Sequence, residues 1–179
     1  DSITGLITVP AGVTSFTVTV PTTDDVLDED DEFYDLVIDS VPATGTIQDN
    51  DTVVVSTVTS DTQTEGTDLV HTVTMSGASA TDETYTFTLV DNTTDSATDY
   101  SSAIFSDGVT YDSVTGLITV PAGVTTFTVT SPTTDDVLDE DDEFYDLTIG
   151  GVSATGTIQD NDTVTVSTVT SDSQLEGTD

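Results

Sequence analysis

The chain contains no lysine and no arginine, although 35 of its 179 residues are aspartate or glutamate, so its formal net charge is −35. No carboxylate can therefore pair with a lysine or arginine of the same chain. An acidic cluster that folding brings together needs backbone N–H donors, water or a metal ion instead, because like charges at close range repel. We therefore expect the fold to depend on something that neutralises its carboxylates.

The residue types nevertheless favour β-structure. Threonine, valine and isoleucine supply 41, 24 and 8 residues, or 73 together, and β-branched side chains suit the half-buried face of a sheet. A hydrophobic content of 34% beside such a charge would otherwise indicate disorder. The composition therefore predicts a sheet protein whose charge is compensated.

The same composition excludes several classes of protein. Without basic residues the chain cannot neutralise a phosphate backbone, so we expect no nucleic-acid partner, and docking to an anionic membrane is equally unfavourable. No apolar run approaches the ~20 residues of a membrane span, and no stretch has the pattern of a signal peptide. Cysteine is absent, which rules out disulfides and thiolate metal sites.

The sequence repeats itself at a constant spacing of 111 residues, since residue 112 matches residue 1. Residues 1–68 match residues 112–179, with 58 of the 68 positions identical. The string TTDDVLDEDDEFYDL at 22–36 returns unchanged at 133–147. A unit of this size is about one small domain and is too long for a solenoid repeat. The spacing therefore predicts similar domains joined end to end.

The polar, turn-prone segment QDND at 48–51 and 159–162 predicts the boundary between units. Residues 52–162 then form one complete repeat, residues 1–51 the C-terminal half of a preceding repeat, and residues 163–179 the first strand of the next. The expected partners are adjacent repeats of the same chain, end to end. The strands that the partial repeats lack would lie outside this sequence or come from neighbouring chains.

Apolar and polar residues alternate along short segments of the complete repeat, which predicts strands. The alternation is clearest over 69–75, 84–89, 127–129, 145–149 and 152–158. Seven or eight such strands without a sustained helical period predict an all-β fold, an antiparallel β-sandwich.

The acidic residues are concentrated in one loop, 135–143, and after the last predicted strand, at 160–162. In a seven-strand Greek-key sandwich these two segments lie at the same pole, and a first strand parallel to the last brings Glu65 there too. Calcium takes 6–8 oxygen ligands and tolerates irregular geometry. Magnesium prefers octahedral sites, and carboxylates without cysteine argue against zinc or copper. The pattern therefore predicts calcium at this pole.

These residues resemble a Calx-beta domain. DDVLDEDDEFYDLTI at 135–149 and ATGTIQDND at 154–162 are similar to the second half of that family, with its paired aspartates, Glu-x-x-Glu, aromatic residue and terminal acidic triplet. TDSATDY at 94–100, VPAGVTTFTVT at 120–130 and Glu65-Gly66 resemble other family features, in the family's order. The resemblance covers the whole complete repeat and implies tandem Ig-like sandwiches.

The resemblance also implies calcium ligands, with several ions in each repeat. In the complete repeat they are Glu65, Asp99, Asp135, Asp136, Glu140, Glu143, Asp160, Asn161 and Asp162, where Asn161 replaces the middle aspartate of the family's triplet. In the partial repeats they are Asp24, Asp25, Glu29, Glu32, Asp49, Asp51 and, as the counterpart of Glu65, Glu176.

Near-identical tandem copies of an acidic, threonine-rich sandwich are similar to the extender repeats of giant RTX-type bacterial surface adhesins. Those proteins leave the cell by type I secretion and stiffen in calcium. The resemblance implies an extracellular spacer at the cell surface that projects distal ligand-binding domains, as adhesins of biofilms do.

Other functions are open on the same residues. The chain could be a carbohydrate- or protein-binding module, a regulatory calcium sensor, or a self-assembling filament or surface layer. Near-identical copies favour the spacer, because adding repeats lengthens the molecule. A binding module should show an exposed aromatic patch, and only 6% of residues are aromatic. We expect no enzyme, because the sequence has no cleft-forming insertion, its carboxylates crowd into one place, and the serines lack a base. His71 alternates with apolar residues and is expected to be a sheet residue.

Overall fold

The computed structural model describes residues 5–177, which form twelve strands and no helix, so the all-β prediction is confirmed. None of the described residues belongs to a helix long and apolar enough to cross a membrane. The strands are β1 (Glu32–Ile38), β2 (Val41–Ile47), β3 (Val55–Val58), β4 (Asp61–Thr64), β5 (Leu69–Met75), β6 (Glu83–Asp91), β7 (Ile104–Phe105), β8 (Thr110–Asp112), β9 (Leu117–Val120), β10 (Thr126–Ser131), β11 (Glu143–Ile149) and β12 (Val152–Gln159).

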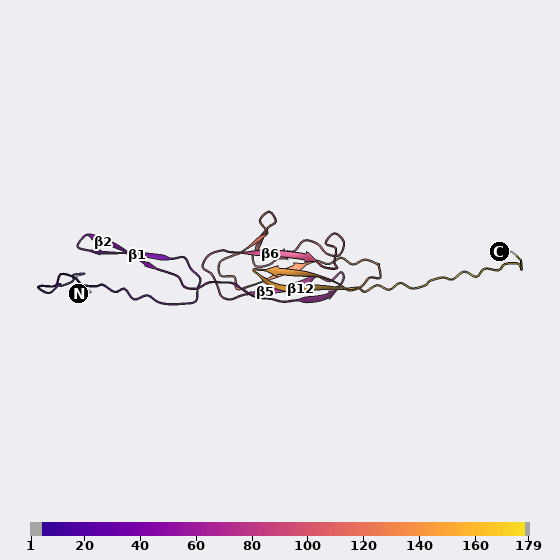
Figure 1. The fold of residues 1–179 in the computed structure, drawn as a ribbon, viewed down its shortest axis with the longest axis horizontal. Coiled ribbons are helices and arrows are strands. Elements are labelled where there is room, and N and C mark those ends of the chain that lie inside the picture. The colour runs from indigo at the N-terminus through magenta and orange to yellow at the C-terminus, as the bar shows by residue number, and fades with distance from the viewer. Residues whose placement is uncertain (1–4, 178–179) are drawn as a thin grey trace.

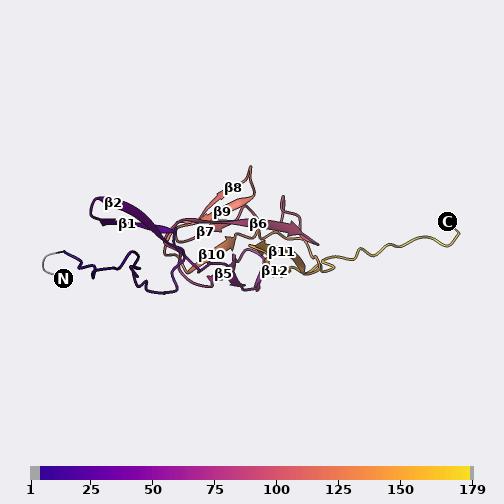
Figure 2. The ribbon, with the colours of Figure 1, turned by 60° about the vertical axis from the view of Figure 1, so that its left-hand side comes forward.

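Ten of these strands form two sheets that pack against each other as in a β-sandwich (Figures 1 and 2). One sheet has the order β3-β5-β10-β7 and the other β4-β12-β11-β6-β9-β8. Every pairing in them is antiparallel except that of β4 with β12. His71 of β5 joins the sheets: Nδ1–H donates to the Thr59 carbonyl (2.7 Å), and Nε2 accepts from the Tyr145 hydroxyl of β11 (2.8 Å).

The core lies between the two sheets. All described apolar residues that are buried fall between Val53 and Ile158, within the expected complete repeat. Strand β5 alternates perfectly between buried and exposed side chains, and so does most of β11. Full burial of a large apolar side chain stabilises the fold by ~1.5–3 kcal/mol, so the alternation read from the sequence determines which face of each strand points inward.

The first strand of the repeat is divided between the two sheets. β3 pairs with β5, whereas β4 pairs in parallel with β12, from Asp61 opposite Gly156 to Thr64 opposite Gln159. The Glu65 N–H, just after β4, donates to the Gln159 carbonyl (3.0 Å). The sequence did not predict β4 as a separate strand, but the expected parallel pairing is present, and it brings Glu65 to the end of β12.

In residues 5–51, strands β1 and β2 form a hairpin that lies outside the sandwich (Figure 1). Its register equals that of β11 and β12, with Glu32 opposite Ile47 as Glu143 is opposite Ile158. The side chains of this partial repeat are nevertheless uncovered: Phe16, which precedes the hairpin, is 51% exposed, whereas its counterpart Phe127 is 1% exposed. The local pairing therefore forms without the opposing sheet.

Residues 163–175 form no strand, and in Figure 1 this segment runs away from the sandwich. Val164 and Val166 are 76% and 84% exposed, whereas their counterparts Val53 and Val55 are 8% and 6% exposed. The strand expected within 163–179 is thus not formed among the described residues. The reason is physical: β3 and β4 pair with β5 and β12, and this segment has no equivalent strands beside it.

Candidate metal centre

Four segments bring carboxylates to one end of the sandwich. They are the residue after β4, the residues after β12, the loop between β10 and β11, and the loop between β6 and β7. The cavity at this end is lined by Glu65, Thr98, Asp99, Thr134, Asp136, Glu140, Asp141, Glu143, Ile158 and Asp160. Most of the carboxylates that the sequence placed at one pole therefore converge there.

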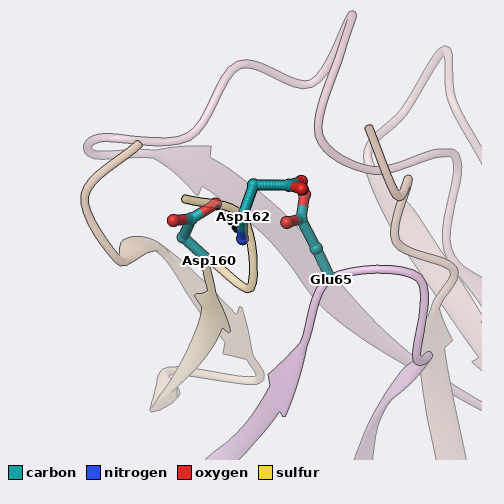
Figure 3. A group of neighbouring side chains, drawn as sticks. All are labelled: Glu65, Asp160 and Asp162. Carbon is teal, nitrogen blue, oxygen red and sulfur yellow. Dashed lines mark hydrogen bonds between the residues drawn. The ribbon is translucent and has the colours of Figure 1, made fainter. Parts of the chain in front are cut away.

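The tightest group consists of Glu65, Asp160 and Asp162. One carboxylate oxygen from each lies within 4.8 Å of the other two. Figure 3 shows the Asp162 carboxylate directed toward Glu65, with Asp160 on the opposite side of Asp162. Two backbone donors hold the group: Asn161 N–H donates to Glu65 Oε1 and Asp162 N–H to Asp160 Oδ1, both at 3.2 Å.

One oxygen of this group lacks a partner. Asp162 Oδ2 is buried, and no group of the described residues hydrogen-bonds to it. A buried carboxylate oxygen without a donor is costly, and the nearest charged groups are carboxylates that repel it. A cation held by the three residues would satisfy this oxygen, so the group fits a metal ion with oxygen ligands.

Gly66 allows Asp135 to approach this group. Asp135 Oδ1 accepts a hydrogen bond from Asn161 Nδ2 (3.2 Å). Gly66 has φ +76°, and a Cβ built on it would lie 2.8 Å from Asp135 Cβ. Any side chain here would strain the backbone and push Asp135 away. This close approach explains why a glycine follows Glu65 at this position.

A second group of carboxylates surrounds a small cavity that Glu65 and Asp160 of the first group also line. Asp99, Asp136, Glu140 and Glu143 line this cavity, which has a volume of about 20 Å³. A void of ~10–15 Å³ or more holds one water-sized occupant. The cavity therefore has room for an occupant of that size among carboxylates of both groups.

Asp99 and Glu143 face each other across this second group, and their pKa values move apart. Burial, the hydrogen bond with Asp99 and the charges of Asp99 and Glu140 raise the pKa of Glu143 to about 7. Burial raises the pKa of Asp99, but hydrogen bonds from Asp95 N–H, Thr98 and Glu143 outweigh it, so that pKa lies below its usual value. Without a cation and below about pH 7, the pair holds a proton on Glu143.

Two other carboxylates resist ionisation for the same reason. Burial and the neighbouring Asp136 and Asp99 raise the pKa of Glu140. Burial and the neighbouring Asp160 and Asp135 raise the pKa of Asp162. The end of the sandwich therefore carries more negative charge than its own donors can stabilise.

The partial repeat builds the same acidic loop. Asn50 Nδ2 donates to Asp24 Oδ1 (3.3 Å), as Asn161 does to Asp135, and Leu27 N–H donates to Asp25 Oδ1 (2.9 Å), as Leu138 does to Asp136. The cavity here is open, at about 230 Å³. It is lined by Asp24, Asp25, Glu29, Glu32, Asp49 and Asp51, among others, and the pKa values of Glu29 and Asp51 are raised, first by burial and then by neighbouring carboxylates.

Glu176, the counterpart of Glu65 in the third copy, is exposed. It belongs to the C-terminal segment that runs away from the sandwich (Figure 1). The structure also adds residues that were not among the expected ligands, although Asp141 and Asp142 belong to the acidic loop seen in the sequence. Thr98, Thr134 and Asp141 line the cavity, and Asp142 accepts a hydrogen bond from Asp160 N–H (3.3 Å). Threonine is so frequent in this chain that no sequence signal marks these two.

A comparison with protein-family models found no match, and a comparison with curated proteins found none either. The resemblance to Calx-beta domains therefore rests on the quoted motifs. The arrangement itself gives oxygen ligands only, in two adjacent groups at the end of a sandwich.

Proposed function

We propose that this chain is a calcium-stabilised structural spacer built of tandem, Ig-like repeats of the Calx-beta type. The observation that carries the proposal is the buried, unpartnered Oδ2 of Asp162 between Glu65 and Asp160. An all-oxygen set of irregular shape suits calcium better than magnesium, zinc or copper. Calcium would supply the positive charge that the chain lacks.

Two sets of residues would hold the ions in the complete repeat. The first is Glu65, Asp160 and Asp162, with Asp135 and Asn161 beside them. The second is Asp99, Asp136, Glu140 and Glu143. The two sets meet at one cavity and together offer more oxygen ligands than the ~6–8 that one calcium ion takes, so the proposal includes several ions per repeat. The loop with Asp24, Asp25, Glu29, Glu32, Asp49 and Asp51 would hold ions of the preceding repeat.

The spacer role is supported by where these groups lie. The chain leaves the complete repeat through Asp160–Asp162, and it enters that repeat through Asp49–Asp51. Both acidic groups thus stand at the ends of repeats that follow one another along an extended molecule (Figure 1). In such a place a bound ion stiffens both the domain and its junction. A secreted adhesin at a bacterial cell surface is the context in which this function would be used.

Thermal unfolding of the full chain tests the proposal. An ion that binds only the folded state stabilises it by ~4 kcal/mol at a thousandfold excess over Kd. We expect a clearly higher Tm in millimolar calcium than in EDTA, and a smaller rise in magnesium. Equal values of Tm in calcium and EDTA would contradict the proposal.

A matched pair of variants locates the effect. Asp136→Ala removes a carboxylate that lines the cavity, whereas Asp107→Ala removes one from an exposed turn after β7. Calorimetry should show weaker calcium binding for the first variant and unchanged binding for the second. The same affinity for both would place the ions elsewhere.

A further inference from the structure

The acidic loop of the partial repeat is bonded to the complete repeat. Asp28 N–H donates to the Ala78 carbonyl (3.3 Å), and Ala80 N–H donates to the Asp28 carbonyl (2.8 Å). Asp28 and Ser79 thereby form a parallel β-bridge. The loop between β5 and β6 is thus a receiving surface for a loop of the preceding repeat.

The Asp28 side chain ties this contact to the chain that connects the repeats. Its Oδ2 accepts a hydrogen bond from Val53 N–H (2.8 Å), where the chain enters the core. Val53 is 8% exposed, and its carbonyl accepts from the Tyr85 hydroxyl (2.9 Å). Asp28 therefore bonds both the receiving loop and the incoming strand.

The receiving loop is held in place by its own repeat. Ser79 is 5% exposed, and its carbonyl accepts from Gly123 N–H (2.9 Å). Its hydroxyl lies within hydrogen-bond distance of Glu83 Oε1 (3.2 Å) and of the Asp28 carbonyl (3.4 Å). A loop fixed on both sides presents Ala78 and Ala80 to a partner in one geometry.

Asp139, the counterpart of Asp28, shows which hydrogen bond of this contact forms without a second repeat. Its Oδ2 accepts from Val164 N–H (2.9 Å), as that of Asp28 does from Val53. Val164 is nevertheless 76% exposed, with no packed domain around it among the described residues. The acidic loop thus holds the chain that follows it even where no other repeat is docked. The backbone at Asp139 can therefore present the same N–H and carbonyl groups that Asp28 uses in its contact.

We propose that Asp28 and the loop of residues 76–80 form a specific joint between repeats, and that Asp139 presents the same edge to the 76–80 loop of a following copy of the domain. The partner is therefore another repeat of this kind, bound through main-chain hydrogen bonds. No bond of the joint passes through a metal ion, so the joint does not rest on the proposed calcium binding.

Amide hydrogen exchange on the full chain tests the joint, by NMR. In the unmodified chain the Ala80 and Val53 amides should be protected. Asp28→Ala removes the carboxylate that accepts from Val53 N–H and should speed exchange of that amide by about tenfold, the effect of losing a hydrogen bond, while the core amide of Leu147 stays unchanged and reports an intact fold. The Ala80 amide donates to the main-chain carbonyl of residue 28, which the variant keeps, so its protection reports the docking itself. An unprotected Ala80 amide in the unmodified chain, or equal exchange of the Val53 amide in the two proteins, would overturn the proposal.

Asp139→Ala is the matched control, because it changes the same position in a loop on which no repeat is docked among the described residues. It should speed exchange of the Val164 amide and leave Ala80 unchanged. A change at Ala80 in this variant would mean that the effect is not local to the joint and would overturn the proposal.

A distance measurement gives a second readout. The chain has no native cysteine, so spin labels at Val41→Cys in β2 and Val114→Cys after β8 are unique, and both positions are exposed. The distance distribution should be narrow, and Asp28→Ala should broaden it. Equal widths would overturn the joint, and the same samples melted with and without calcium test the proposed function separately.

Discussion

Two glycines with almost the same backbone differ in what lies beside them. Gly66 has φ +76° and lies against Asp135, whereas Gly116 has φ +72° and nothing within 4 Å of the Cβ position. Alanine at either position pays the cost of a left-handed backbone, ~1 kcal/mol or more. We predict that only Gly66→Ala also lowers calcium affinity, because it displaces Asp135. Isothermal titration of both variants measures this, and equal affinities would contradict it.

Glu143 makes the stability of the calcium-free protein depend on pH. Its pKa is about 7 in the folded chain and 4.5 as an ordinary glutamate. Between these values the folded state holds a proton that the unfolded state has released, so the contribution of Glu143 to stability falls as pH rises through this window and is constant above it. We predict that Tm in EDTA decreases from about pH 5 to 7 more steeply in the native chain than in Glu143→Gln.

Calcium should abolish that dependence, because the ion takes the place of the proton. The expected decrease of Tm between these pH values should therefore disappear in millimolar calcium. Parallel pH profiles for the native chain and Glu143→Gln in EDTA would show that this carboxyl keeps an ordinary pKa.

At the scale of strands, the two copies of one hairpin offer a controlled comparison. Tyr145 stands opposite Gly156 in β11 and β12, and Tyr34 stands opposite Gly45 in β1 and β2. In both pairs a Cβ on the glycine would collide with the tyrosine ring. Tyr145 is fully buried and bonded to His71, so it cannot move aside, whereas Tyr34 is only half-buried.

We predict that Gly156→Ala lowers the free energy of unfolding by ~1–3 kcal/mol, the usual cost of overpacking a core. Gly45→Ala should change it by much less, because the Tyr34 ring can rotate into solvent. Denaturant titration of both variants checks the difference. A large loss in Gly45→Ala would show that the hairpin also contributes to the cooperative core.

The strands with clear alternation could be predicted because burial alone determines their faces. Leu69, Val73, Leu147 and Ile149 are all fully buried at the positions that period two assigns. β4 could not be predicted, because its sequence DTQT has no apolar residue and it becomes a strand only by pairing with β12. Strand content there depends on tertiary contact rather than on local sequence.

The candidate site also has one part that local sequence predicts and another that depends on contacts between distant residues. The acidic loop is determined locally, since two copies in different surroundings make the same hydrogen bonds around Asp24 and Asp135. The approach of Glu65 to Asp162 followed from the expected parallel pairing of distant strands. The role of Asp28 could not be found, because nothing distinguishes it in sequence from the acidic residues beside it.

For the whole molecule, the link between repeats is short. Only Thr52 separates Asp51, in the acidic group of one repeat, from Val53, in the core of the next. Calcium in that group would fix the few dihedral angles that remain, whereas repulsion between uncompensated carboxylates should loosen them. We predict a longer and narrower particle in calcium than in EDTA by small-angle X-ray scattering of the full chain. An unchanged maximum dimension, with calcium binding established by calorimetry, would mean that the ions stabilise the individual domains without stiffening the link between them.

The parallel pairing of β4 with β12 determines how the repeat responds to a pulling force. The chain enters the sandwich through β3 and β4 and leaves after β12, so tension on its two ends draws these neighbouring strands in opposite directions. Their hydrogen bonds, from Asp61 opposite Gly156 to Thr64 opposite Gln159, are then loaded together in shear rather than opened one at a time. An ion held by Glu65 and Asp160 would cross-link the ends of the same two strands, at the place where sliding would begin.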